Sequence, residues 1–186
     1  MATRKRAPKS RRVYTRKHYS SNDGMLTTVW GPSTWHLLHT MSFNYPVNPS
    51  CADKTHYRDF VLSLQHVLPC GKCRANLRKN FRKLPLRMAD MESRRTFSLY
   101  MYRLHEHVNR MLGKKSGLSY QDVRERYEHF RARCAQPVIE NPVTEEKGCT
   151  EPLHGEKAKC VLHIVPQKTK CETFQMDKTC VKTRSV

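Results

Sequence analysis

The chain has 186 residues, and its 35 Lys and Arg against 16 Asp and Glu give a formal net charge of +19. No apolar run is long enough to cross a membrane, and the start of the chain lacks the apolar core of a secretory signal, so we expect neither a membrane protein nor a secreted one. The charge favours acidic partners, nucleic acid or an anionic cofactor. Eight cysteines in such a chain are most often catalytic, redox-cycling or metal-bound, because reducing compartments disfavour structural disulfides.

Residues 1–23 form a basic N-terminal arm. The arm contains eight Lys and Arg, has no acidic residue before Asp23, and shows no apolar periodicity. Because it has too little apolar surface to bury, we expect it to be disordered. A solubilising tail, a contact with acidic partners or nucleic acid, and a nuclear address all fit this composition.

Residues 24–133 are predicted to form a helical domain, because apolar residues recur in them at helical spacing. The predicted helices span residues 30–45, 53–68, 70–81, 97–112 and 119–130. Capping signals are Ser33 or Thr34 for the first helix, Asp53 for the second and Ser119 for the fifth. The fold class is therefore all-α, a four-helix bundle with a short fifth helix.

Glycine and proline predict where the helical domain ends and where an irregular tail begins. Gly113 is expected to close the fourth helix. Residues 134–186 contain four prolines that interrupt any helix, and their cysteines recur every nine to eleven residues after Cys149. We interpret this segment as an irregular tail with little core of its own, in which residues 160–165 are predicted to form one short strand.

The stretch with the most chemical content is Cys70-Gly71-Lys72-Cys73, directly after Pro69. Pro69 ends one helix and suits the start of the next, so both thiols are expected one turn apart at a helix N-terminus. There the unpaired N–H groups, the helix dipole and nearby cations stabilise a thiolate. The alternatives are two inert thiols or half of a zinc site, but zinc needs about four ligands and the sequence has no second Cys-x-x-Cys. The motif favours redox chemistry without naming an enzyme, and no metal ligand is assigned.

A second block combines an imidazole and an amide on one helical face. His105, Val108, Asn109 and Leu112 share that face, and Lys114 follows at the C-terminal end. Taken alone, the block fits a buried polar site and a solvent-exposed surface equally well.

Three motifs in this order resemble the Erv/ALR family of FAD-linked sulfhydryl oxidases. The first reads WGPSTWHLLHT from Trp30, with Tyr45-Pro46 after it; the second reads PCGKC from Pro69; the third reads H-x-x-V-N-x-x-L-G-K from His105. The resemblance covers residues 26–131. It implies a helical bundle that binds FAD at one end, forms a homodimer through its first two helices, and oxidises the dithiols of protein substrates with oxygen, producing hydrogen peroxide.

The resemblance also implies roles for single residues. Cys73 corresponds to the thiol beside the flavin, and Cys70 to the thiol that exchanges with substrates. The positions that fall on FAD contacts are Gly31, Trp35, His39, Tyr45, Cys73, His105, Val108, Asn109, Lys114, Arg126 and Tyr127. Aromatic rings suit stacking on a flavin or adenine, and basic side chains suit the pyrophosphate. The sequence has no Gly-x-Gly-x-x-Gly, so FAD is not expected on a Rossmann fold.

Three positions that differ from the usual family pattern indicate which kind of organism or virus encodes the protein. Pro32 stands where many members have Arg, and Tyr102 and Tyr120 stand where cellular members usually carry a cysteine pair between the fourth and fifth helices. Absence of that pair resembles the versions encoded by large DNA viruses. We therefore expect a viral protein in the host cytoplasm or the virion, with the mitochondrial intermembrane space or the nucleus as alternatives.

Two questions stay open at this point. The cysteines outside the motif either relay electrons from substrates as a mobile pair or form structural disulfides. These are Cys51, Cys134, Cys149, Cys160, Cys171 and Cys180. The rival function is a basic, zinc-stabilised protein that binds nucleic acid, which is based on the charge and on the Cys and His content.

Overall fold

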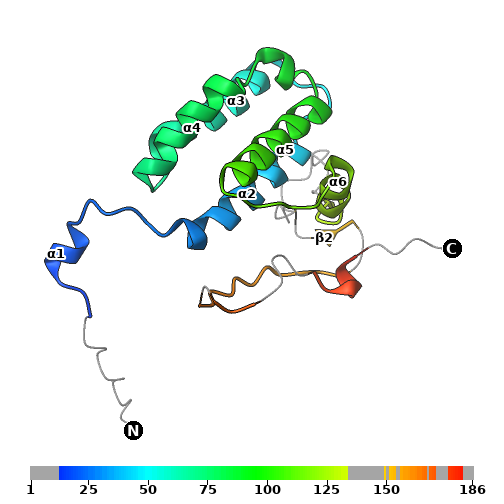
Figure 1. The fold of residues 1–186 in the computed structure, drawn as a ribbon. Helices are drawn as coiled ribbons and strands as arrows, with labels where there is room; N and C mark the ends of the chain where they lie inside the picture. The colour runs from blue at the N-terminus through cyan, green and yellow to red at the C-terminus, as the bar shows by residue number, and fades with distance from the viewer. Residues whose placement is uncertain are drawn as a thin grey trace, which may run out of the picture.

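The computed structural model describes residues 13–133, 149, 151–153, 156–166, 168–170 and 176–181. The elements are α1 (Arg16–Tyr19), α2 (Thr27–Phe43), α3 (Cys51–Val67), α4 (Gly71–Lys83), η1 (Met88–Met91), α5 (Arg94–Met111), α6 (Tyr120–Glu128), β1 (Ala132–Arg133), β2 (Glu151–Pro152) and η2 (Lys178–Cys180). Figure 1 shows α2, α3, α4 and α5 as a bundle, and α6 packs against α2 and α5. The predicted all-α fold, with four main helices and a short one after them, is confirmed.

Local capping explains several helix boundaries. Ser119 caps α6, as predicted: its hydroxyl accepts the Asp122 N–H, and the Asp122 carboxylate accepts the Ser119 N–H. The same reciprocal arrangement starts α3, but there Ser50 is the cap and Asp53 is its partner three residues later, so the predicted cap was one turn too late. Gly113 has φ +67° just beyond α5, and its predicted role in ending that helix is confirmed.

The N-terminus of α2 differs from the prediction. The helix begins at Thr27, three residues before the predicted start, and no side chain caps it. Ser33 and Thr34 both lie inside the helix, where the Thr34 hydroxyl donates to the Trp30 carbonyl (3.0 Å). Pro32 also stands inside the helix, although a proline is most often found in the first turn of one.

The core lies between the bundle helices. Its buried apolar residues are Leu38, Tyr45, Val61, Leu77, Phe81, Leu86, Met91, Phe97, Tyr100, Met101 and Leu104. Full burial of one such side chain contributes about 1.5–3 kcal/mol relative to exposure. This core fixes α2 against α5 and α3 against α4, which places the predicted site residues on rigid elements.

Two segments outside the bundle differ from their predictions. α1 forms one exposed helical turn inside the arm, for which no regular structure was expected. Residues 160–165, predicted as a strand, are not a strand, and their valine, leucine and isoleucine side chains are exposed. A strand needs a hydrogen-bonded neighbour, and the pair formed in the described residues is instead β1 with β2, which joins the tail to the end of α6. Among the described helices, none has the length and apolar character to cross a membrane.

Candidate functional site

The Cys-x-x-Cys motif forms a disulfide at the start of α4. Cys70 and Cys73 are bonded to each other, with their Cα atoms 5.2 Å apart. Cys70 is the N-cap residue, and its Sγ accepts a hydrogen bond from the Cys73 N–H (3.2 Å). Both cysteines are half-buried, so a thiol from another molecule has access to the bond. We call residues 69–73 the redox turn.

The segment before α2 packs on the redox turn. The Met25 N–H donates to the Pro69 carbonyl (2.9 Å). A Cβ on Gly24 would lie 3.1 Å from that carbonyl oxygen and 3.4 Å from the Cys70 Cα, so a side chain there requires the turn to shift. At the first residue of α2, the Thr27 hydroxyl lies 3.7 Å from the Cys73 Sγ. Neither Gly24 nor Thr27 was predicted, because their roles depend on a contact across more than forty residues of sequence.

Two arginines tie the redox turn to the end of α3. The Arg74 guanidinium donates to the Leu68 carbonyl, and Arg78 donates to the Gln65 carbonyl (3.3 Å). These carbonyls belong to the last turn of α3, where helix C-termini favour cations. The same cations add positive charge beside the cysteines, as the sequence predicted for this motif.

A cluster of rings from α2, α5 and α6 forms a second site. The cluster consists of Trp35, His36, His39, Phe43, His105 and Tyr127, and we call it the ring cluster. Trp35 stacks on His105, with centroids 4.0 Å apart and planes at 5°. His39 Nε2 lies 2.9 Å from His105 Nδ1, and His36 Nδ1 lies 3.2 Å from the Tyr127 hydroxyl.

Burial keeps the ring cluster uncharged near neutral pH. Burial, with smaller contributions from the charges of His105 and His36, lowers the pKa of His39 to about 3. Burial likewise lowers the pKa of His105 to about 4, and raises the pKa of Tyr127 to about 12. One polar atom stays unsatisfied here, because His39 Nδ1 is buried without a hydrogen-bond partner among the described residues. An unsatisfied buried polar atom costs stability unless a ligand or water meets it.

α2 connects the two sites. Thr27 contacts Cys73, and Trp35 belongs to the ring cluster, so the two sites are about 12 Å apart along the helix axis. Gly31 lies one turn from each of them. A Cβ on Gly31 would meet only the Thr27 Cγ2, at 3.6 Å, which leaves the surface between the two sites free of side-chain bulk.

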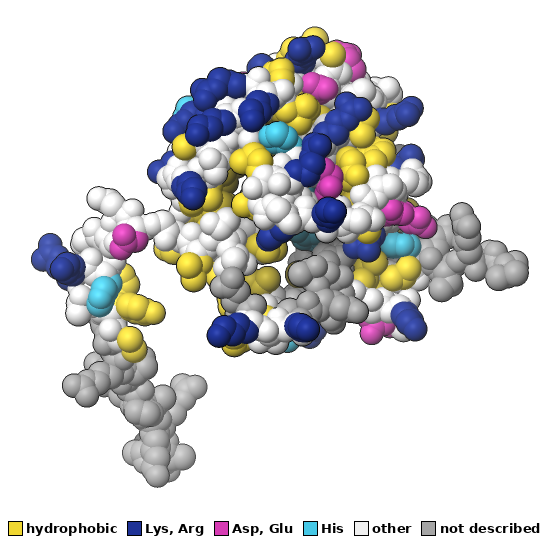
Figure 2. Space-filling model, viewed as in Figure 1, with side chains coloured by type: hydrophobic (Ala, Val, Ile, Leu, Met, Phe, Trp, Pro, Cys, Tyr) yellow, Lys and Arg dark blue, Asp and Glu magenta, His cyan; other side chains and the backbone are white. Residues whose placement is uncertain are grey.

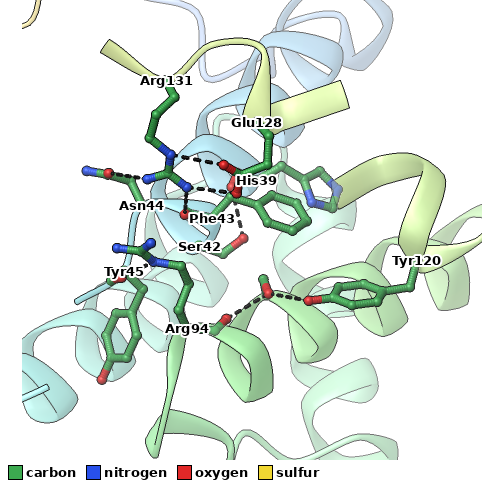
Figure 3. Close-up of polar contacts among 10 residues, drawn as sticks. His39, Ser42, Phe43, Asn44, Tyr45, Arg94, Tyr120, Glu128 and Arg131 are labelled. Carbon is green, nitrogen blue, oxygen red and sulfur yellow. Dashed lines mark hydrogen bonds and ion pairs between the residues drawn. The ribbon is translucent and has the colours of Figure 1, made fainter. Parts of the chain in front are cut away.

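An arginine after α6 fixes this helix on the end of α2 (Figure 3). Arg131 bonds the Glu128 carboxylate (2.8 and 3.1 Å), the Asn44 Oδ1 (3.1 Å) and the Phe43 carbonyl (3.0 Å). Phe43 in turn stacks on Tyr127, with planes at 15°. Arg131 therefore positions the part of α6 that completes the ring cluster. Sequence reasoning missed this residue, because only the packed fold shows its partners.

The comparisons with known proteins agree with this geometry. A model of the Erv1/Alr family matches residues 32–128, more than half of the chain. This chain belongs to the Erv1/Alr family. A probable FAD-linked sulfhydryl oxidase from Acanthamoeba polyphaga mimivirus is 37% identical over 99 residues, which are 53% of this chain and 68% of that protein. An FAD-linked sulfhydryl oxidase from African swine fever virus is 28% identical over 53% of this chain and 80% of its own.

A solved structure extends the comparison to the fold. The crystal structure of the FAD-binding domain of Erv1 from Saccharomyces cerevisiae has a TM-score of 0.51 and 27% identity, and the match covers 55% of this chain and 94% of that one. The Erv1/Alr relatives from Arabidopsis thaliana and Saccharomyces cerevisiae are longer proteins, of which the match spans 42% and 43%. The likeness thus concerns the helical domain that holds both sites.

The remaining predicted Erv1/Alr positions lie around the ring cluster or apart from it. On α5, Val108 is half-buried, and the Asn109 side-chain amide donates to Glu106 (3.0 Å). Lys114 and Arg126 are exposed and form no ion pair with any other described residue. Leu112, expected on the apolar face, is 60% exposed because it follows the last turn of α5.

The structure contradicts the predicted role of Tyr45. It was interpreted as an FAD contact, but its side chain has no exposed surface. Its ring packs on Tyr57 and Phe97, and its hydroxyl donates to the Met91 carbonyl (2.9 Å). A ligand has no access to such a side chain, so we assign Tyr45 to the core.

The tyrosines that replace the family's cysteine pair contact each other. The rings of Tyr102 and Tyr120 meet edge to face, with centroids 5.9 Å apart. The Tyr102 hydroxyl donates to the Leu118 carbonyl (2.8 Å), and the Tyr120 hydroxyl lies 2.9 Å from the Ser98 hydroxyl. α5 is thus connected to the start of α6 by aromatic packing and hydrogen bonds.

The other cysteines lie in different environments. Cys51 and Cys160 are free and exposed, and Cys180 is free and half-buried. Cys149 is disulfide-bonded. Cys134 and Cys171 lie outside the described residues.

Proposed function

We propose that the protein is an FAD-linked sulfhydryl oxidase, which converts the dithiols of protein substrates into disulfides with oxygen as the final electron acceptor. The observation that carries the proposal is a disulfide at a helix N-terminus, joined by α2 to an uncharged ring cluster around the buried His39. The membership in the Erv1/Alr family and the names of the viral relatives support the same activity.

The residues present fit FAD. His39 offers a buried nitrogen that no described residue satisfies, and the pair of Trp35 and His105 offers flat aromatic surface for a planar ring. We assign the pyrophosphate to the unpaired cations Lys114 and Arg126, since charge-assisted hydrogen bonds to phosphate are the strong ones. The other assigned contacts are Gly31, His39, Val108, Asn109, Cys73 and Tyr127. When bound, FAD supplies a two-electron acceptor that oxygen reoxidises, giving hydrogen peroxide.

The thiol chemistry follows from the redox turn. A substrate thiolate attacks the Cys70 Sγ, which breaks the Cys70–Cys73 bond, forms a mixed disulfide with Cys70 and releases Cys73 as a thiolate. The second substrate thiolate attacks the substrate sulfur of that mixed disulfide, so the substrate leaves oxidised and Cys70 leaves as a thiolate. Both protons go to solvent, and the enzyme pair holds the two electrons.

The chain's own groups stabilise the thiolates. The N–H groups at the start of α4 and the positive end of its dipole lower the energy of negative charge on either sulfur. The Thr27 hydroxyl stands within reach of the Cys73 Sγ as a donor. Because this contact turns Cys73 toward α2 and the ring cluster, the geometry supports Cys73 as the sulfur beside the cofactor and Cys70 as the exchanging one.

We also propose a homodimer and a viral setting. α2 and α3, the first two helices of the bundle, expose Leu37, Phe60 and Val67, which suits an apolar contact between two copies. The mimivirus and African swine fever virus relatives favour a protein of the host cytoplasm or the virion. The rival zinc-dependent function gains no support from the described residues, in which no three His, Cys, Asp or Glu side chains are placed to hold a metal.

For the tail, we propose that Cys149 is structural and that Cys160 and Cys180 form the candidate relay pair, because the latter are free. Replacement of both free cysteines by serine, assayed with a protein substrate and with dithiothreitol, separates the roles. Loss with the protein substrate alone supports a relay, and unchanged rates with both substrates refute it.

The optical spectrum of the purified protein tests the main proposal. We expect a yellow protein with one FAD per chain, whose absorbance bleaches on anaerobic addition of dithiothreitol and returns with oxygen, with one peroxide formed per disulfide. A colourless protein that carries metal, or a flavin that dithiothreitol does not bleach, would overturn it.

A further inference from the structure

The solvent face of α4 is entirely cationic, and it begins at the redox turn. The exposed side chains of α4 are Lys72, Arg78, Lys79, Arg82 and Lys83. No Asp or Glu occurs anywhere in residues 60–89. We call these five side chains the basic face. Figure 2 shows Lys and Arg gathered over the region where Figure 1 places α3 and α4.

The basic face is unneutralised. Three ion pairs occur in the described residues, and none of them involves α4. Arg78 is the one member with a hydrogen bond to another described residue, to the end of α3, whereas the other four side chains point into solvent without such a bond. The face is therefore available to a partner.

The charge is unfavourable for the helix itself. Arg78 with Arg82, and Lys79 with Lys83, are like charges four residues apart, which destabilise a helix. Lys72 adds a cation in the first turn, where the helix dipole disfavours one. Arg82 and Lys83 lie in the last turn, where the helix dipole favours cations. Helix stability therefore explains these two residues and does not explain the other three cations of the basic face.

We propose that the basic face docks an acidic segment of the protein substrate, next to the dithiol that reacts with Cys70. The inference rests on the proposed oxidase function and names the class of its substrate. From Lys72 to Lys83 the helix rises about 16 Å, the length of about five residues of extended peptide. Five cations along that length can pair with several Asp or Glu side chains that flank the substrate cysteines. The positive electrostatic potential of these cations also attracts the substrate thiolate to the redox turn.

Nucleic acid is the other polyanion such a face attracts. The position of the face decides between protein and nucleic acid, because the face starts at Lys72, between the two reactive cysteines, where a nucleic acid would cover the disulfide. A protein segment carrying its own dithiol gains from that position, since binding brings the reacting sulfurs together.

Two dithiol peptides test the proposal on the full-length protein loaded with FAD. They share one Cys-x-x-Cys and differ in five flanking residues, which are Glu and Asp in one and Gln and Asn in the other. Oxygen consumption at low salt is expected to give a kcat/KM about tenfold higher for the acidic peptide, and the preference is expected to disappear near 0.5 M salt, where screening is strong. Equal values for both peptides at low salt overturn the proposal.

Charge variants locate the effect. The combination Lys79→Glu, Arg82→Glu and Lys83→Glu is expected to remove the preference for the acidic peptide and to leave dithiothreitol oxidation within about twofold. The matched control carries Lys157→Glu, Lys159→Glu and Lys170→Glu, the same change in charge on exposed tail lysines, and is expected to keep the preference. Equal loss in both variants assigns the effect to net charge and overturns the proposal. A second variant carries Lys79→Gln, Arg82→Gln and Lys83→Gln. It removes the same cations without placing acidic residues at the C-terminus of α4, so it controls for a loss of folding caused by the glutamates.

A binding measurement separates this inference from the oxidase function. Fluorescence anisotropy with the acidic peptide, its cysteines replaced by serine, requires no turnover and is expected to show binding that the α4 variant loses. A single-stranded oligonucleotide is the competing probe. If the oligonucleotide binds through the basic face and the acidic peptide does not, the face is a nucleic-acid surface and the proposal is wrong. If no dithiol is oxidised at all, dithiothreitol included, it is the oxidase function that fails.

Discussion

The redox turn and the ring cluster lie on the same helix and have opposite environments. The redox turn is half-buried, positively charged and open to solvent thiols, with Thr27 as its contact on α2. The ring cluster is uncharged, with His39 and Phe43 buried and its other rings half-buried, and the pKa values of His39 and His105 are lowered to about 3 and about 4. The difference matches two tasks, because thiolate exchange needs charge stabilisation and solvent access, whereas a planar cofactor needs a dry and flat surface.

Loss of either sulfur of the redox turn is expected to have the largest effect on turnover and to leave the ring cluster in place. Cys70→Ser and Cys73→Ser each remove the disulfide, so turnover of any dithiol should fall at least about a thousandfold, as for residues that act as one unit. The flavin content of Cys70→Ser, measured by absorbance after desalting, should stay unchanged, because Cys70 is not an assigned FAD contact and the ring cluster is intact.

Cys51→Ser is the matched control, since Cys51 is free and exposed at the start of α3. It is expected to keep full turnover of dithiothreitol. If Cys70→Ser retained more than about a tenth of the activity, exchange would have to begin at another sulfur, and the assignment of Cys70 would be wrong.

Acid is expected to destabilise the folded protein through the histidines of the ring cluster. The native pKa values of His39 and His105 lie below the ordinary value of 6.5, so the unfolded chain takes up protons first as the pH falls. The free energy of unfolding should therefore drop from about pH 6.5 toward pH 4, by up to about 1.4 kcal/mol per pH unit for each histidine. Urea denaturation at several pH values measures this slope.

Variants identify the groups responsible for that slope. His39→Gln combined with His105→Gln should flatten it, and His66→Gln on the exposed side of α3 is the matched control. A slope that survives the double substitution would show that other groups carry the pH dependence.

The two regions also differ in how far the sequence predicted them. The redox turn was predictable because its geometry is local: a proline, a helix start and two cysteines three residues apart. The ring cluster was predictable as a set of residues only through the family resemblance, since Tyr127 meets His36 across 91 positions of sequence. Tyr45 stands in the same motif as Trp35 and His39, but the chain turns after α2 and carries it into the core, which no local pattern reports.

Arg131→Met sharpens the comparison by loosening α6 without replacing a residue of the redox turn or of the ring cluster. It removes the bonds to Glu128, Asn44 and the Phe43 carbonyl, which we expect to cost about 2 kcal/mol of the free energy of unfolding, after allowance for the partial exposure of the ion pair. Because α6 then holds Tyr127 less firmly, FAD should dissociate more readily, while dithiothreitol still reduces the Cys70–Cys73 bond at the normal rate. Titration of apoprotein with FAD measures the first effect, and rapid quenching with thiol alkylation the second.

Arg103→Met is the control for Arg131→Met, because Arg103 is exposed on α5 and makes no hydrogen bond with the described residues. Equal weakening of FAD binding by both substitutions would mean that Arg131 has no special role in placing α6.

The smallest expected effect concerns the contact that replaces the family's cysteine pair. Tyr120→Phe removes the hydroxyl that meets Ser98, a residue with 1% of its surface exposed, but keeps the ring contact with Tyr102. Ser98 still donates to the Arg94 carbonyl, so one hydrogen bond is lost and no donor is stranded, which costs about 1 kcal/mol. Thermal unfolding should give the same decrease with and without reducing agent, because no disulfide takes part. Tyr14→Phe in the exposed arm is the control and should have no effect. A decrease that appears only under reducing conditions, or no decrease at all, would mean that the Tyr120 hydroxyl does not stabilise the contact of α6 with α5 in this way.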